Sequence, residues 1–279
     1  MYIIIFIFIV SPSVYMFFKI LRQSRRKKLQ ALPVNPKWEK IIEKNLPVYL
    51  KLTDQMKTEL HGHIRVFIHE KNFEGCGGLE LNDEIRVTVA AQACILLLNR
   101  KTAYFPKLSS ILVYPSAFVA RNIRNSQGFV ADAQVHLGES WRTGAVVLSW
   151  DDIVRGGVDP NDGHNVVLHE FAHQLDQEDG AGDGTPVLPN YSRYMPWARV
   201  MGKEFDVLQK KASSGTKALM DYYGATNPAE FFAVATETFF EKSRNLQKRH
   251  PELYDQLKDY YQLDPAAWRV NKVPKHTKN

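Results

Sequence analysis

The sequence has little cysteine: Cys76 and Cys94 are the two cysteines among 279 residues, and they form no Cys-x-x-Cys pair. A disulfide framework or a cysteine zinc cluster needs more thiols at paired spacings, so both are excluded. Two isolated cysteines are typical of a reducing compartment, where such side chains usually pack in the core.

Periodic and strongly biased segments are also absent. The 14 prolines and 16 glycines follow no repeat, which excludes a collagen-like or low-complexity chain. With 44% hydrophobic and 24% charged residues, the composition excludes a disordered chain and a membrane protein with many spans. The length predicts one large or two small domains.

Acidic residues are missing from the start of the chain, and this absence accounts for the net charge of +6. Six basic residues lie there without a counter-charge: Lys19, Arg22, Arg25, Arg26, Lys27 and Lys28. The remaining 30 basic residues balance 30 acidic residues. A nucleic-acid-binding protein spreads basic residues over a globular face, so this single tract predicts no direct nucleic-acid binding. A short basic tail, residues 269–279, ends the chain.

The sequence has one long hydrophobic run, Met1–Phe18, which contains no charged residue. About 18 to 21 helical residues, at about 1.5 Å each, reach across a hydrocarbon core of ~30 Å. Because the basic residues follow the run, the positive-inside rule predicts a single-pass anchor at 1–21 in a bacterial inner membrane, with a basic linker at 22–36 and a cytoplasmic domain. The alternatives are a signal peptide, a mis-assigned start codon and a cytoplasmic location.

The pattern of residues 37–268 predicts an α+β domain. Strands are expected at 63–69, where apolar and polar residues alternate, and in the short apolar runs 111–114 and 145–148. Helices are expected at 85–98, 164–176, 196–212, 228–242 and 250–262. The strands should form a small mixed sheet with residues 144–150 at its edge, where an extended peptide can pair, and the later helices a C-terminal helical part.

The helix expected at 164–176 carries the sequence His169-Glu-Phe-Ala-His173. Residues four apart share one face of a helix, so both imidazoles can bind one cation. Glu170 follows His169 and can reach a water on that cation rather than the cation itself. Two neutral imidazoles and an open position fit one catalytic Zn²⁺ per chain.

Acidic residues compete for the position of the third ligand. Asp179 lies six residues after His173, as in metzincins, but Asp176 stands where those proteins need a glycine to turn the helix. Asp176 itself either orients a histidine or is a solvated acid at the helix end. Residues 178–184 are expected to form a flexible lid beside the site.

Two later acids, on the helix expected at 228–242, are the other candidates. Glu230 fits a gluzincin arrangement, in which the ligand comes from a second helix, although Asn227 and Pro228 before it also fit a capping box. Glu237 shares its face but lies roughly 10 Å along the helix, so both cannot bind one ion. The spacing alone leaves Glu230 and Glu237 open.

Several segments resemble the Mlc titration factor A family of zinc-dependent peptidases. His169–Asp176 and Tyr223–Glu230 resemble its catalytic segments, which are also similar to those of anthrax lethal factor. The upstream segments that resemble the family are Phe73–Leu79, Ala90–Cys94 and Tyr114–Phe118. The resemblance covers about residues 35–265 and implies a zincin-like metallopeptidase domain of gluzincin type.

The resemblance also implies roles for individual residues. It implies that His169, His173 and Glu230 bind the metal, that Glu170 is the general base, and that Tyr223 assists at the oxyanion. Lethal factor has a further acid four residues after its third ligand, whereas this chain has Val234 there, so no such role carries over.

We therefore expect a zinc metallopeptidase that hydrolyses peptide substrates by general-base catalysis. The resemblance implies aminopeptidase-like activity and binding to an Mlc-like transcriptional repressor of glucose-regulated genes. Two alternatives stay open: a repressor-sequestering protein whose zinc site is structural or regulatory, and a metallohydrolase that acts on a non-peptide amide.

Overall fold

A computed structural model describes residues 2–116, 138–141, 144–159 and 161–269, with the side chains of residues 2–13 and 138–141 left outside the description. The helices are α1 (Tyr2–Gln30), α2 (Pro36–Asn45), α3 (Asp54–Glu70), α4 (Asp83–Ile95), α5 (Trp150–Val158), α6 (Val166–Asp176), α7 (Tyr194–Ser214), α8 (Pro228–Glu241), α9 (Ser243–Arg249) and α10 (Pro251–Tyr261). The strands are β1 (Asn72–Gly75), β2 (Ser110–Tyr114), β3 (Gly138–Trp141) and β4 (Ala145–Ser149).

The four strands form one small mixed sheet in the order β1-β2-β4-β3. The pairs β1–β2 and β2–β4 are parallel, whereas β3 runs antiparallel to β4. The expected mixed sheet and α+β class are therefore confirmed. The expected edge position of 144–150 is wrong, because β4 is an inner strand and β3 occupies that edge.

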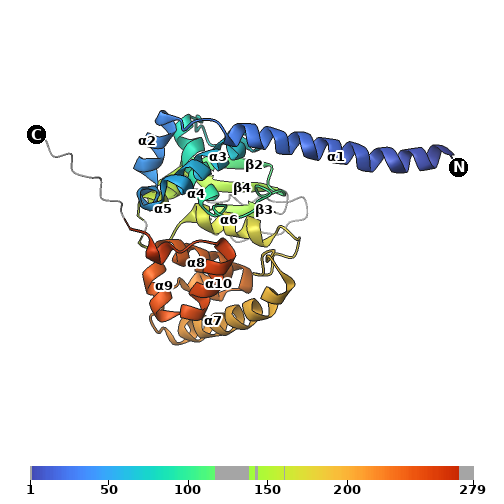
Figure 1. Cartoon of the computed structure of the whole chain (residues 1–279). Helices are drawn as coiled ribbons and strands as arrows, with labels where there is room; N and C mark the ends of the chain where they lie inside the picture. The colour runs from blue at the N-terminus through green and yellow to red at the C-terminus, as the bar shows by residue number, and fades with distance from the viewer. Residues whose placement is uncertain (1, 117–137, 142–143, 160, 270–279) are drawn as a thin grey trace, which may run out of the picture.

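Helix α6 lies between the sheet and the C-terminal helices α7 to α10 (Figure 1). The predicted helices at 164–176, 196–212, 228–242 and 250–262 correspond to α6, α7, α8 and α10. Helix α6 contacts β3 on one side and α8 on the other. It is therefore the element at which the two halves of the domain meet.

The strand predicted at 63–69 is wrong, because these residues lie inside α3. Helix α3 begins after Thr53, whose side chain accepts the Met56 N–H as an N-cap, and it packs against both α1 and α4. Residues 60–67 are consequently all buried. A helix covered on several sides shows no apolar stripe with a period of 3.6 residues, so a chance alternation imitates a strand.

The N-terminal region also differs from the prediction. The segment expected to be a linker, 22–36, is helical as far as Gln30, because α1 packs on α3 through Arg22 and Arg26, which both pair with Glu70. Most of the anchor expected at 1–21 falls on side chains outside the description. Among the described residues, no helix combines the length and apolarity needed to cross a membrane.

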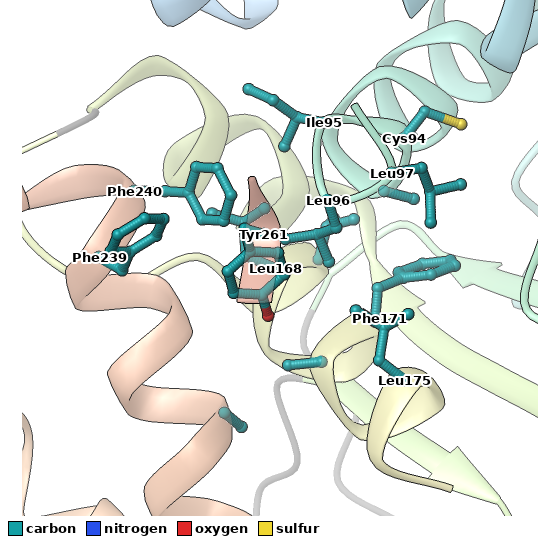
Figure 2. Packing of buried hydrophobic residues seen from close by; sticks show 14 of the residues in the cluster. Cys94, Ile95, Leu96, Leu97, Leu168, Phe171, Leu175, Phe239, Phe240 and Tyr261 are labelled. Atoms are coloured by element: carbon teal, nitrogen blue, oxygen red, sulfur yellow. The ribbon is translucent and has the colours of Figure 1, made fainter. Parts of the chain in front are cut away.

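The hydrophobic core reaches one face of α6. Leu168, Phe171 and Leu175, at spacings of three and four residues, point into the core. Figure 2 shows them near side chains at the C-terminal end of α4, near Phe239 and Phe240 of α8, and near Tyr261. Because this stripe faces inward, the polar residues between its members are directed to the opposite side of α6.

Candidate metal centre

The first part of the site is the start of α6. Asn165 caps this helix, since its Oδ1 atom accepts the Leu168 N–H at 3.0 Å, as expected for an N-cap. The cap fixes where the helix begins and therefore which residues lie opposite the core stripe. His169 and His173 lie there, with side chains 14% and 12% exposed.

The second part is the first turn of α8. Asn227 caps α8 by accepting the Glu230 N–H at 3.0 Å, and Pro228 occupies the first helical position. The Glu230 carboxylate faces the two imidazoles of α6 instead of taking part in a capping box. The cap fixes the backbone of Glu230, and the Glu230 side chain is free to face the two histidines.

Three donor atoms converge between these helices. Oε2 of Glu230 lies 3.0 Å from Nε2 of His169 and 3.3 Å from Nε2 of His173, and the two Nε2 atoms are 3.2 Å apart. A tetrahedral Zn²⁺ with ligands at about 2.0–2.2 Å keeps its ligand atoms about 3.3–3.5 Å apart. The separations and the donor types therefore fit a zinc ion.

The charges around His169 favour a cation at this point. Burial disfavours the charged imidazole, but hydrogen bonds with Glu230 and Glu237, and the charges of Glu237 and Glu170, outweigh burial and raise the pKa of His169 to about 10. Burial likewise acts against the charged form of Glu230, but the hydrogen bonds with His169 and His173 lower its pKa to about 2. A proton or a metal ion stabilises this arrangement, and a metal competes with that proton.

Glu237 contacts the other nitrogen of His169. Its Oε1 atom lies 2.8 Å from Nδ1 of His169, on the side of the ring away from Glu230. The sequence pattern presents Glu237 only as a rival metal ligand, and the structure places it outside the group of converging donors. A metal-binding histidine usually needs a hydrogen-bond acceptor for its second nitrogen, and this requirement could have suggested Glu237 as that acceptor.

Glu170 and Tyr223 lie beside the converging donors. Glu170 is buried, and its charge acts on both His169 and Tyr223. The Tyr223 ring lies in the short 3-10 helix Tyr222–Ala225, 5.9 Å from the His169 ring, and is 56% exposed. Partial burial, followed by the charges of Glu230 and Glu170, raises the pKa of Tyr223 to about 12, so the phenol keeps its proton at neutral pH.

Asp176 and Asp179 have other partners. Asp176 is fully buried, and both its oxygens accept the Gly184 N–H at 2.9 Å, so it fastens the end of the 177–184 loop and is not a solvated acid. Burial raises the pKa of Asp176 to about 6. Asp179 accepts the Ala181 N–H within the loop itself.

Gly184 joins this loop to α8. Its φ is +85°, and a Cβ atom there would lie 2.4 Å from the carbonyl oxygen of Pro228. Its own carbonyl accepts the indole N–H of Trp197 at 3.2 Å. A glycine is required because the loop backbone passes directly against the turn that presents Glu230.

Comparisons with known proteins cover both helices of the site. Residues 21–262 match a family described as glucose-regulated metallo-peptidase M90. An uncharacterized protein of Synechocystis is 43% identical over 244 residues, which are 86% of this chain and 89% of that protein. Proteins named Mlc titration factor A are 32% identical over 228 residues in Yersinia pestis (80% of this chain, 83% of the relative) and 29% identical over 236 residues in Escherichia fergusonii (83% and 87%).

Proposed function

Because the chain belongs to the glucose-regulated metallo-peptidase M90 family, we propose that it is a zinc-dependent peptidase. In this proposal His169, His173 and Glu230 hold the metal through the two Nε2 atoms and the carboxylate. The observation that carries it is the convergence of these three donors within 3.3 Å of one another, between two separately capped helices. When bound, zinc polarises the scissile carbonyl and makes a water more acidic.

Glu170 is the proposed general base. It follows His169 on α6, so its carboxylate reaches the space beside the donors without joining them. There it takes a proton from the attacking water and passes it to the leaving amine. Tyr223, as a protonated phenol, donates a hydrogen bond to the oxygen on which negative charge develops.

The substrate class follows from the family resemblance and from the sheet. We infer aminopeptidase-like activity on short peptides. Strand β3 lies beside α6 and pairs with β4 along one side, and among the described residues no strand pairs with its other side. An extended peptide can add to that side as a further strand, which would bring its backbone next to α6.

The test is hydrolysis of a panel of aminoacyl-anilides and peptides by the full chain and by its Glu170→Gln variant, each loaded with one equivalent of zinc. We expect kcat to fall by about 10²–10⁴ in the variant, because the base is lost. Zinc content should stay equal, since Glu170 is not a proposed ligand. Equal activity of the two proteins would contradict the role of Glu170.

A second candidate function comes from the names of relatives. Proteins named Mlc titration factor A are similar over most of this chain, so binding of an Mlc-like repressor is an alternative or additional function. In that case the zinc site can be structural or regulatory. If no substrate is cleaved by either protein, and a purified Mlc-like repressor binds both, the binding function is favoured over the peptidase.

A further inference from the structure

We propose that Glu237 is a positioning residue that fixes the ring and the tautomer of His169, so that the Nε2 lone pair is directed at the metal. This inference rests on the proposed metal site and extends it by one residue. It concerns a side chain on the third turn of α8, two turns beyond the proposed ligand Glu230.

Both oxygens of Glu237 are engaged. Oε1 lies 2.8 Å from Nδ1 of His169, and Oε2 accepts the backbone N–H of Asn165 at 2.6 Å. The side chain is 7% exposed, so water does not compete strongly for it. A carboxylate only accepts hydrogen bonds, so Nδ1 carries a hydrogen and is not the nitrogen available to a metal. A metal would then displace the proton from Nε2, the nitrogen that faces Glu230, and bind its lone pair.

The contact with Asn165 makes this arrangement rigid. Asn165 is the N-cap of α6, and its carbonyl accepts the His169 N–H at 2.9 Å. The carboxylate of Glu237 therefore holds the start of α6 and the ring of His169 at once. A rotation of the ring would break the Nδ1 bond, and a shift of the carboxylate would leave a buried N–H without its acceptor.

The variant Glu237→Gln separates positioning from packing, because it keeps the shape but offers one acceptor oxygen to two N–H donors. We expect the Kd for zinc to rise about 10- to 100-fold. The matched control is Glu204→Gln on α7, a buried carboxylate whose Oε2 atom lies 2.7 Å from Nδ1 of His250. Neither residue is among the converging donors, so the control should bind zinc like the wild type.

The measurement is competition for Zn²⁺ between the full chain and a fluorescent chelator, together with the melting temperature of the metal-free proteins. Each substitution is also made in His169→Ala and in His173→Ala. If Glu237 acts through His169, Glu237→Gln adds nothing to His169→Ala and adds its full 10- to 100-fold loss to His173→Ala.

The outcomes separate this inference from the proposed function. An unchanged zinc Kd in Glu237→Gln, or an equal loss in both histidine backgrounds, overturns the positioning role and leaves the metal site intact. A wild-type protein that binds no zinc overturns the metal site and this inference together. A loss of affinity confined to variants with a greatly lowered melting temperature identifies a packing role and also overturns it.

Discussion

Two groups of partly buried charges in this molecule each place a glutamate between two basic residues, but they differ in the atoms that meet. At the junction of α1 and α3, Glu70 pairs with Arg22 at 2.6 Å and with Arg26 at 2.7 Å. Between α6 and α8, Glu230 faces His169 and His173 at 3.0 and 3.3 Å. The carboxylates are similarly shielded, with side chains 12% and 17% exposed.

The difference lies in which atoms meet. At the junction, guanidinium donors meet carboxylate acceptors, so the group is complete without any further species. Between α6 and α8, neutral imidazoles would bring two Nε2 lone pairs and a carboxylate oxygen together, and all three are acceptors. A complete ion pair holds a helix in place, whereas converging acceptors indicate a place for a cation.

The largest effect should come from removing a metal ligand from the group between α6 and α8, compared with removing an arginine from the junction of α1 and α3. We expect His173→Ala to weaken zinc binding by on the order of 10³-fold, because one of three protein ligands is lost. Arg26→Ala should leave the zinc Kd unchanged and lower the free energy of unfolding by about 1–3 kcal/mol, because Glu70 loses a charged partner.

Chelator competition and urea unfolding of both variants measure these effects. Excess zinc at 100 times Kd should stabilise the Arg26→Ala protein by about 2.7 kcal/mol, as for the wild type. Weakened zinc binding in Arg26→Ala would show that the two charged groups are not independent.

A smaller effect is expected from a side chain that borders the metal site without belonging to the converging donors. Tyr223→Phe should lower kcat about 10²-fold, because one hydrogen-bond donor to the developing oxyanion is lost, with no change in zinc Kd. Tyr222→Phe is the matched control, since the Tyr222 hydroxyl donates to the Thr216 carbonyl at 2.6 Å. Steady-state kinetics on the same peptide should place Tyr222→Phe at the wild-type rate, and equal losses would argue against the oxyanion role.

The smallest effect concerns the pH dependence of the junction. Burial raises the pKa of Glu70, but its hydrogen bonds with Arg26 and Arg22 outweigh burial and lower this pKa from 4.5 to about 2. The unfolded chain therefore binds more protons between these values, and the stabilisation is lost as pH falls from about 4.5 towards 2. We expect a difference of about 1 kcal/mol between wild type and Glu70→Gln at pH 6, because the Arg22 side chain is largely exposed and solvent screens part of the interaction.

Urea unfolding of the metal-free proteins at pH 6, 5, 4 and 3 measures this difference. It should shrink as the pH falls, because the pairing is lost in the wild type alone. A difference that stays constant across this range would mean that Glu70 has an ordinary pKa in the folded protein.

Sequence reasoning succeeded where local chemistry is sufficient. Asn227 with Pro228 predicts the start of α8, because caps act through neighbouring residues. The strand at 63–69 was wrong, since burial of α3 on several sides depends on α1 and α4, which are remote in sequence.

The third metal ligand could not be predicted from local sequence patterns alone. Spacing alone leaves Glu230 and Glu237 open, because the distance of each from His169 depends on how α8 packs against α6. The structure assigns them to opposite nitrogens of the same ring. The buried position of Asp176 depends likewise on a loop that returns to its helix, which no local pattern records.

The contacts of Gly184 affect the local fluctuations of the two helices that carry the metal site. This residue is hydrogen-bonded to Asp176 at the end of α6 and to Trp197 of α7. It also packs against Pro228 in the first turn of α8. Helices α6 and α8 therefore cannot separate without breaking at least one of these contacts. The exchange of its amide hydrogen with solvent reports how often its bond to Asp176, at the end of α6, opens.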